Sequence, residues 1–277
     1  MTSAAETAYL LDGLRQNIRN DGRVREETRA ISIMTDVIPS ANCSVRISRS
    51  DSSVLIGIKA ELTTSLSNPL EGEVSFSCEY ASNCDETSSS LEHCIRSFAL
   101  VPFDKTQLLV KEGALAWHLY VDCLIERSNG SMLDLIAMGL RACLSCLELP
   151  RVNVLAGAEE GEQYRIGFEE TQMNRISELS LPLAISFGIL GGSVFMDPDF
   201  QEESIVGQGT EFAGGLVTVF VNQTGQTCGI CKFGVAPIDP TLLPGIISLA
   251  QKLATTSQNE LTSALQAETA GEDNKGI

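Results

Sequence analysis

Alternation between apolar and polar positions divides the first half of the chain into short strands and a few helices. Runs of β-branched residues with a period of two predict strands, and apolar residues three and four positions apart predict helices. A helix is expected over residues 4–18, and the turn residues Asn20-Asp-Gly22 end it. The strands expected before residue 150 cover residues 31–34, 44–48, 54–61, 74–78 and 115–126.

Two further helices are expected in the first half. Apolar residues follow helical spacing over residues 89–100 and again over residues 132–146. A polar loop over residues 81–90 separates the first of these helices from the strand before it. The first half is therefore expected to be a sheet with two helices that ends at Pro150.

The second half repeats the order of strands followed by a helix. The strands expected there cover residues 182–190, 193–196, 210–221 and 227–233. The first two should form a hairpin that turns at Gly191-Gly192. Asp239 as N-cap and Pro240 in the first turn begin a final helix that extends to about residue 266.

Two halves with the same order of elements indicate an internally duplicated α+β fold, with mixed β-sheets flanked by α-helices. The duplication is visible in element order and not in residue identity. The expected segments are an N-terminal helix over residues 1–18, a first half over 19–150, a second half over 151–266 and a disordered tail over 267–277. The tail is expected to be disordered because it is composed of small and polar residues.

The charge of the chain limits what it can bind by itself. It carries 19 basic and 36 acidic residues among 277, which is a formal net charge of −17. Such a chain repels phosphate backbones at long range, so a free-standing nucleic-acid-binding module is not expected. Any contact with RNA requires a local basic patch or basic partner chains.

Cysteine content and the N-terminal segment indicate a reduced, intracellular protein. Nine cysteines in a chain of this length do not form a disulfide scaffold. Residues 1–11 lack the basic start and apolar run of a signal peptide. No apolar stretch reaches the roughly 20 residues that a membrane helix needs, so no contact with a membrane is expected.

Two Cys-x-x-Cys pairs are the first candidates for chemistry. Cys143 and Cys146 lie within an apolar helical pattern, and Cys228 and Cys231 lie within a strand pattern. A structural zinc site needs four soft ligands in tetrahedral geometry, and the gap between these pairs is longer than in usual zinc modules. Buried apolar cysteines are therefore the favoured interpretation, and neither a metal nor a redox centre is expected.

Enzyme motifs of the common nucleophilic and nucleotide-binding classes are absent from the sequence. The chain has two histidines, His93 and His118, and no Gly-x-Ser-x-Gly elbow, Walker loop or dinucleotide fingerprint. Acidic residues gather at Asp197, Asp199, Glu202 and Glu203, directly after a strand. Such a group can bind magnesium or act in acid–base catalysis, but a solvated turn is the simpler interpretation.

Motif order adds a resemblance to a known family. Arg19-Asn-Asp-Gly-Arg23, followed by Glu27-Thr-Arg29, matches the opening of RNase PH-like proteins. Further segments resemble RNA exosome ring subunits of the ribosomal RNA-processing protein 42 type. They cover residues 53–62, 71–73, 110–122, 129–134, 150–152 and 197–203. The resemblance extends over residues 19–250 and depends on several motifs in the right order.

This resemblance implies two β-sheets flanked by helices, in one subunit of a six-membered ring around an RNA channel. Active members cleave RNA 3′ ends with inorganic phosphate, which requires positive donors at the site. Their phosphate-binding loop falls on Gly130, Ser131 and Met132, and methionine cannot hold phosphate. Their paired aspartates fall on Asp197 and Glu203, so the acid geometry is only partly kept.

Candidate RNA contacts are also implied by the resemblance. Active members carry two arginines on the first long helix, where this chain has Arg96 alone. Arg96 is the first candidate for contact with the RNA backbone, and Arg127 and Lys111 are weaker candidates.

The expected function is that of a non-catalytic structural subunit of the exosome ring, which supports 3′–5′ RNA processing and degradation and helps to line the channel. The expected partners are other RNase PH-like ring subunits, cap RNA-binding subunits and an associated nuclease. The expected locations are the nucleus, including the nucleolus, and the cytoplasm, and no cofactor is expected. The alternative is an active phosphate-dependent 3′–5′ exoribonuclease that completes its site with arginines of a neighbouring subunit.

Overall fold

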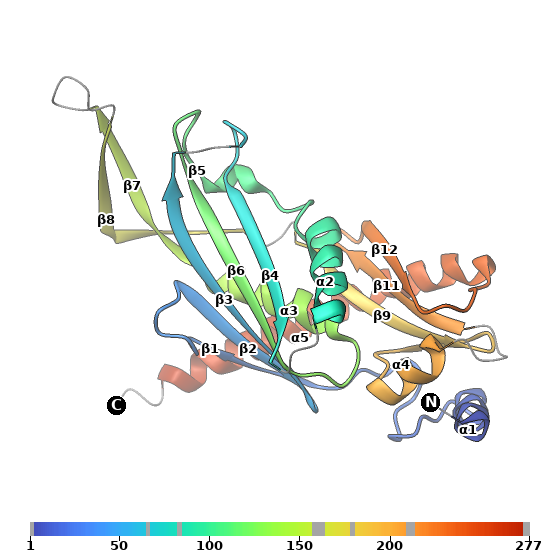
Figure 1. The fold of residues 1–277 in the computed structure, drawn as a ribbon. Coiled ribbons are helices and arrows are strands. Elements are labelled where there is room, and N and C mark those ends of the chain that lie inside the picture. The colour runs from blue at the N-terminus through green and yellow to red at the C-terminus, as the bar shows by residue number, and fades with distance from the viewer. Residues whose placement is uncertain are drawn as a thin grey trace.

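The computed structural model describes residues 3–64, 67–81, 85–156, 164–177, 181–208 and 214–273. Within these residues, the strands form a six-stranded sheet, a four-stranded sheet and a two-stranded ribbon. Helices pack between and behind the two larger sheets (Figure 1). The fold is therefore α+β with mixed sheets and flanking helices, as the sequence predicts.

The first sheet contains the strands of the first half. Its strands are β1 (Ile31–Thr35), β2 (Cys43–Arg49), β3 (Ser52–Thr63), β4 (Glu73–Tyr80), β5 (Leu109–Lys111) and β6 (Leu115–Arg127). Their order is β1-β2-β3-β6-β4, with β5 paired to the start of β6, and β4 runs parallel to β6. Val54, Ile56 and Ile58 of β3 are fully buried, because every second side chain of a strand points to the same face.

The second sheet is antiparallel throughout. Its strands are β9 (Leu183–Leu190), β10 (Ser193–Met196), β11 (Gly214–Val221) and β12 (Thr227–Phe233), in the order β10-β9-β11-β12. Gly191 and Gly192 join β9 to β10 with φ values of 55° and 79°. A two-residue type I′ hairpin needs positive φ at both positions, so the predicted hairpin is confirmed at these glycines.

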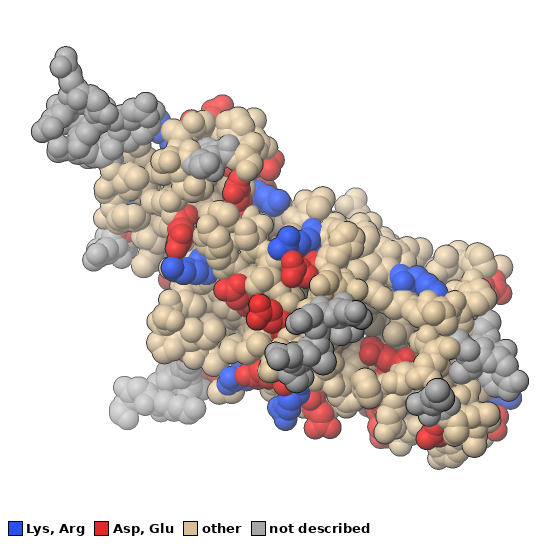
Figure 2. Space-filling view, in the orientation of Figure 1, with Lys and Arg blue, Asp and Glu red and all other residues tan. Residues whose placement is uncertain are grey.

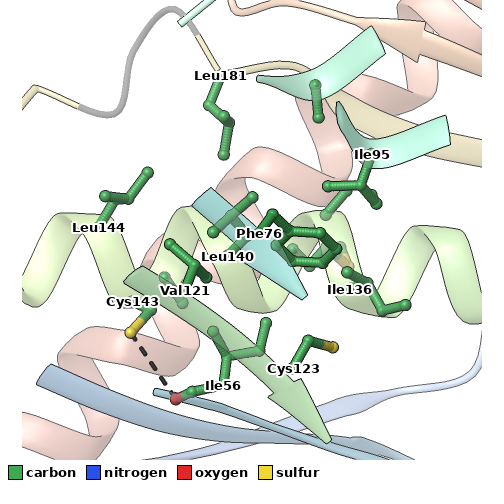
Figure 3. Packing of buried hydrophobic residues seen from close by; sticks show 14 of the residues in the cluster. Ile56, Phe76, Ile95, Val121, Cys123, Ile136, Leu140, Cys143, Leu144 and Leu181 are labelled. Atoms are coloured by element: carbon green, nitrogen blue, oxygen red, sulfur yellow. Dashed lines mark hydrogen bonds between the residues drawn. The ribbon is translucent and has the colours of Figure 1, made fainter. Parts of the chain in front are cut away.

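Helix α3 (Met132–Cys146) lies between the two sheets and contacts β2, β3 and β9. Its residues from 132 to 144 are all buried, which is typical of a helix that is covered on every side. Figure 3 shows Ile136, Leu140 and Leu144 of α3 packed among Phe76 and Val121 of the first sheet. The helix matches the predicted bounds, because its apolar pattern is long and uninterrupted.

Helix α5 (Leu243–Asp273) follows a short 3₁₀ turn over Pro240–Leu242, with Asp239 as its N-cap. Ile246 and Ala250 cover the second sheet, and Leu261 packs with the core of the first sheet. We expected a disordered tail from residue 267, but the helix continues to Asp273, and residues 274–277 lie outside the described residues. The extra turns contain alanine and glutamate, which are strong helix formers.

The N-terminal helix α1 (Ala4–Arg15) ends before residue 18, where we expected its end. Asn17 has a φ of 58°, and the amide of Ile18 donates to the carbonyl of Gly13 at 2.9 Å. This pair of features is a Schellman motif, which stops a helix at the residue with positive φ. Leu10, Leu11 and Leu14 share a cluster with residues of β9, β10 and α4.

Helix α2 (Asp85–Cys94) begins four residues before the predicted start, within the segment expected to be a loop. A π-helical turn, η1 (Ile95–Ala99), continues it. Phe98 of η1 stacks on Phe220 of β11 with ring centroids 5.5 Å apart. This contact joins a helix of the first half to the second sheet.

Several elements were not expected from the sequence. They are the 3₁₀ turn η2 (Lys105–Leu108), strand β5, the ribbon of β7 (Glu148–Ala156) and β8 (Tyr164–Arg175), and helix α4 (Phe200–Gly207). The ribbon projects away from the two larger sheets (Figure 1). Strand β7 passes through Pro150, where we placed the boundary between the halves, and that boundary stays a prediction.

Gly139 of α3 allows the helix to lie close to the first sheet, and its replacement tests this packing. A Cβ there would lie 2.8 Å from Cγ2 of Ile47 and 2.9 Å from Cδ1 of Ile56. We expect Gly139→Ala to lower the free energy of unfolding by about 1–3 kcal/mol through overpacking. Gly245→Ala in α5 is the matched control, because a Cβ there meets nothing within 4 Å and should raise stability by up to about 1 kcal/mol. Urea denaturation measures both, and equal effects would contradict the packing.

Candidate functional site

The predicted site residues meet at the turn that joins β10 to α4. Asp197 follows β10 directly and has a φ of 44°, in the left-handed region that aspartate tolerates better than most residues. Asp199 is the N-cap of α4, and Glu202 and Glu203 lie in the first turn of that helix. The acidic cluster therefore lies at a strand-to-helix turn. This turn is not solvated, because Asp197 and Glu202 are each 1% exposed.

Three arginines from the N-terminal part of the chain enclose the carboxylate of Asp197. Arg29 donates from its backbone amide and from Nε to Oδ2, both at 2.9 Å, and from Nη2 to Oδ1 at 2.6 Å. Arg23 donates to Oδ2 at 2.9 Å, and Arg49 donates to Oδ1 at 3.3 Å. Both oxygens of Asp197 are thus engaged within the protein.

The arginines decide the protonation state of Asp197. Burial by itself would raise the pKa of this carboxyl, but the hydrogen bonds from Arg29 and the charges of Arg49 and Arg29 outweigh it and hold the pKa at about 2. Asp197 is therefore a permanently charged partner of the arginines at neutral pH. Both of its oxygens accept from arginines, and the residue is almost fully shielded from solvent.

Arg19 fastens the same turn from a second direction. Its Nε donates to Oε1 of Glu202 at 2.9 Å, and its Nη2 is ion-paired with the other carboxylate oxygen. It also donates to the carbonyls of Met196 at 2.8 Å and Asp197 at 3.0 Å, and lies over the ring of Phe195. The motif over residues 19–29, which carries the family resemblance, is therefore structural in this chain. We call the contacts of Arg19, Arg23, Arg29 and Arg49 with this turn the clamp.

Helix α4 had a signal in the sequence that we missed. Asp199 accepts from the amide of Glu202 at 2.9 Å, and Glu202 accepts from the amide of Asp199 at 2.9 Å. An acceptor followed three residues later by glutamate is a capping box, which marks the start of a helix. The short helix buries only Ile205, Val206 and Glu202, so its apolar periodicity is weak.

The predicted phosphate loop does lie beside the two acids. Gly130 has a φ of 79°, and a Cβ there would lie 2.3 Å from the carbonyl oxygen of Pro198. Ser131 donates from its hydroxyl to that carbonyl at 2.9 Å and from its backbone amide to Oε1 of Glu203 at 2.7 Å. Ser131 is also the residue before α3, so a carboxylate of the protein accepts from the amide at the start of this helix.

Unlike Asp197, Glu203 accepts no hydrogen bond from an arginine among the described residues. Burial raises its pKa to about 7, although the amide of Ser131 opposes the shift, and the charge of Asp134 raises it further. Asp134 is itself buried, which raises its pKa to about 7 against the opposing charge of Arg49. It accepts from the amide of Ser186 at 2.9 Å and from its hydroxyl at 2.5 Å.

A cavity of about 330 Å³ opens beside Glu203. We call it the Glu203 pocket, and the residues that define it are Met132, Phe200, Glu203, Leu216, Thr218 and Phe233. Of the described residues that line it, Glu203 alone carries a charged side chain. The described lining of the pocket thus contains no lysine or arginine to hold phosphate.

The candidate RNA contacts are not gathered at one place. Arg96 lies on η1, where it pairs with Glu92 at 2.8 Å and donates from Nε to the carbonyl of Phe76 at 3.0 Å. Its side chain is still 55% exposed. Arg127 ends β6, whereas Lys111 on β5 lies beside the start of β6, so the two are at opposite ends of a 13-residue strand.

His118 and several of the described cysteines have partners of their own. His118 accepts or donates a hydrogen bond with Ser75 at 2.8 Å and stacks on Tyr120, on strands of the first sheet. Cys143 lies 3.5 Å from Cys43, and Cys231 lies 3.5 Å from Cys94. No cluster that could hold a metal ion occurs within the described ranges, and none of their helices is long and apolar enough to cross a membrane.

Comparison with known proteins decides the family. Residues 27–150 match the model of domain 1 of the 3′ exoribonuclease family, RNase PH, and residues 180–252 match that of domain 2. The chain belongs to the RNase PH family. Its likeness to an archaeal exosome core structure, with a TM-score of 0.73 at 23% identity over 93% of this chain and 96% of the other, shows the same fold.

Curated relatives of this RNase PH family member are named as exosome components. It is 26% identical to the exosome complex component RRP42 of Saccharomyces cerevisiae, over 91% of this chain and 95% of the relative. It is also 26% identical to the exosome complex component Rrp42 of Methanocella arvoryzae, over 91% of this chain and 94% of the relative. Both relatives are matched over nearly their full length, so the resemblance predicted from the motifs is confirmed.

Replacement of Asp197 tests the clamp of this RNase PH domain pair. We expect Asp197→Asn to lower the free energy of unfolding by about 3–5 kcal/mol, because it leaves buried guanidinium groups without their counter-charge. Asp12→Asn is the control, since the pair of Asp12 with Arg15 is exposed and contributes about 0–1 kcal/mol. Urea denaturation measures both variants, and similar small losses would contradict the clamp.

Acid provides an independent test of the same pairs. The pKa of Asp197 is lowered to about 2, below its ordinary value. Its contribution to stability is therefore fully present above about pH 4 and is lost as the pH falls toward 2. This part of the acid dependence should be absent from the Asp197→Asn variant.

Proposed function

We propose that this chain is a non-catalytic subunit of an RNA exosome ring, which supports 3′–5′ RNA processing and degradation through its partners. Its RNase PH domains and its curated relatives, which are named as exosome components, support membership of such a ring. The observation that carries the non-catalytic part is the composition of the Glu203 pocket. Among the described residues that line it, there is one acid and no base.

Phosphorolysis needs positive groups to bind the attacking phosphate and the charge that develops in the reaction. In this chain, the arginines near the site are already neutralised, since Arg23, Arg29 and Arg49 all bind Asp197. The amide of Ser131, which could bind an anion at the start of α3, already donates to Glu203. A phosphate ion would therefore meet a carboxylate where it needs a cation.

One observation favours the alternative of an active exoribonuclease. The pKa of Glu203 is raised to about 7, which is suitable for a group that exchanges protons at neutral pH. Activity would then require a neighbouring subunit to supply the phosphate-binding arginines. The two functions differ in one measurable product, a nucleoside diphosphate.

The proposed partners are other RNase PH-like ring subunits, cap RNA-binding subunits and an associated nuclease, in the nucleus, including the nucleolus, and in the cytoplasm. Ile166, Phe168 and Met173 of β8 are each at least 44% exposed, and uncovered apolar side chains on a projecting ribbon favour a protein partner. On the face in Figure 2, basic side chains are scattered among acidic ones. An acidic subunit of this kind needs basic neighbours to contact RNA.

Purification of the tagged chain from cells tests the proposal. We expect it to recover other RNase PH-like subunits in equal amounts, together with cap proteins. Neither the isolated chain nor the recovered assembly, incubated with RNA and inorganic phosphate, should release nucleoside diphosphates in a way that depends on Glu203. Recovery of the chain alone would contradict ring membership. Phosphate-dependent release of nucleoside diphosphates that Glu203→Gln abolishes would instead support the active alternative.

Arg96 remains the proposed RNA contact. Its exposed guanidinium lies on η1, and we expect Arg96→Glu to reduce RNA crosslinking to this subunit in the assembled ring several-fold. The slope of the logarithm of RNA affinity against the logarithm of salt concentration should decrease by about 1, which corresponds to the loss of one phosphate contact. Arg15→Glu on α1 is the control, because Arg15 is also exposed but lies on another helix. Unchanged crosslinking in the Arg96 variant would rule out the contact.

A further inference from the structure

The Glu203 pocket combines one carboxyl group with apolar and aromatic walls. Its walls are largely apolar and include the aromatic rings of Tyr80, Phe200 and Phe233. Its volume of about 330 Å³ is sufficient for a small organic group. The pocket therefore offers apolar and aromatic walls that can bury the apolar part of a ligand.

The acidic groups at the pocket are two carboxyls, each with a pKa raised to about 7. Glu203 lines it directly, and Asp134 lies behind Ser186, which also lines it. The positive charge of Arg29 is nearby but is bound to Asp197. The segments 82–87 and 209–213, which follow and precede lining residues in the sequence, contain no lysine or arginine. The described pocket therefore has no cation of its own to pair with Glu203.

The hydroxyl groups of the pocket reinforce this preference. Ser186 donates from its hydroxyl to Asp134 at 2.5 Å, and its oxygen lies 2.8 Å from the hydroxyl of Thr218. Because the hydroxyl of Ser186 donates its hydrogen bond to Asp134, the hydroxyl of Thr218 donates to the oxygen of Ser186. The lone pairs of Thr218 therefore remain available to accept a hydrogen bond. A ligand that donates hydrogen bonds therefore suits the side of the pocket formed by Ser186 and Thr218 better than one that accepts them.

We propose that the Glu203 pocket binds an organic cation of the guanidinium type, such as the side chain of an arginine. The carboxylate of Glu203 would accept from the planar guanidinium, and the aromatic rings would contact its face and its apolar stem. Phosphate and other small anions would be excluded. This site goes beyond the proposed role in the ring, because it depends on the chemistry of the pocket and not on assembly.

The probe for this site is N-acetylarginine amide, with N-acetylcitrulline amide as the uncharged control of nearly equal shape. The full chain, labelled with ¹³C at its methionine methyl groups, reports binding through Met132, which lines the pocket. Met173 on β8 is the internal control, because it lies outside the pocket. We expect the arginine probe to shift the Met132 signal saturably, with a dissociation constant on the order of 1 mM, and the citrulline probe to bind at least tenfold more weakly.

Substitution assigns the binding to Glu203. Glu203→Gln keeps the shape of the side chain and an oxygen for the amide of Ser131, but removes the charge. We expect it to weaken binding of the arginine probe at least tenfold. Glu260→Gln on the exposed face of α5 makes the same change in net charge and should have no effect.

Binding should also depend on pH. The described titratable and charged groups that act on Glu203 are Asp134 of α3, Arg29 of the N-terminal segment and Asp197 of the turn before α4. Since the pKa of Glu203 is raised to about 7, its charged form grows from a minor to the major species between pH 6 and pH 8. We expect affinity for the arginine probe to rise roughly tenfold over this range, because the probe itself stays charged.

Comparison of the free chain with the assembled complex separates two sources of the cation. If an arginine of a partner chain fills the pocket, the probe will shift Met132 in the isolated chain but not in the complex. If a free small molecule is the natural ligand, the probe will bind both. Equal binding of the citrulline probe, or unchanged binding to Glu203→Gln, would overturn the proposal. Phosphorolysis would contradict only the proposed function, since the titration contains neither RNA nor phosphate.

Discussion

Burial of the Asp197 carboxylate is the constraint on which the rest of the site depends. A buried charge is costly unless it is paired, and here Arg23, Arg29 and Arg49 pair with it. These arginines lie between 148 and 174 residues away in the sequence, so the ion pairs hold the N-terminal segment and the first sheet against the turn that follows β10. Arg19 extends the same clamp to Glu202 at the start of α4. The positions of α4 and of Glu203 follow from these contacts.

The clamp also explains why two acids six positions apart behave differently. Asp197 has arginines on both oxygens, which keep it ionised. Among the described residues, Glu203 accepts a hydrogen bond from the amide of Ser131 and none from an arginine, and its pKa is raised to about 7. Positive charge that could have served a phosphate site is used to stabilise the fold. What remains in the Glu203 pocket is a carboxylate among apolar and aromatic walls, which is suited to a cation and unsuited to phosphate.

Helix α3 connects the packing of the molecule to this site. It is buried on all sides between the two sheets, and its first residues form part of the Glu203 pocket. Gly139 permits the close approach of α3 to β2 and β3. Asp134 of the same helix places a carboxyl group behind Ser186, which lines the pocket. A shift of α3 would therefore change the pocket as well as the core. The same helix that completes the hydrophobic core fixes the geometry around Glu203.

The sequence by itself determined the elements whose pattern is local and the family to which they belong. The strands of both sheets except the short β5, together with α3 and the hairpin at Gly191-Gly192, were predicted because side-chain periodicity and positive φ act over a few residues. Tertiary structure alone decided the ribbon of β7 and β8, the clamp on Asp197 and the lone charge of Glu203. The ion pairs of the clamp on Asp197 join residues 148 to 174 positions apart in the sequence, the ribbon joins residues up to 27 positions apart, and the charges at the site depend on which groups are buried together. No periodicity in the chain encodes such pairings, so only the folded molecule shows that the arginines bind Asp197 and that no described residue forms an ion pair with Glu203.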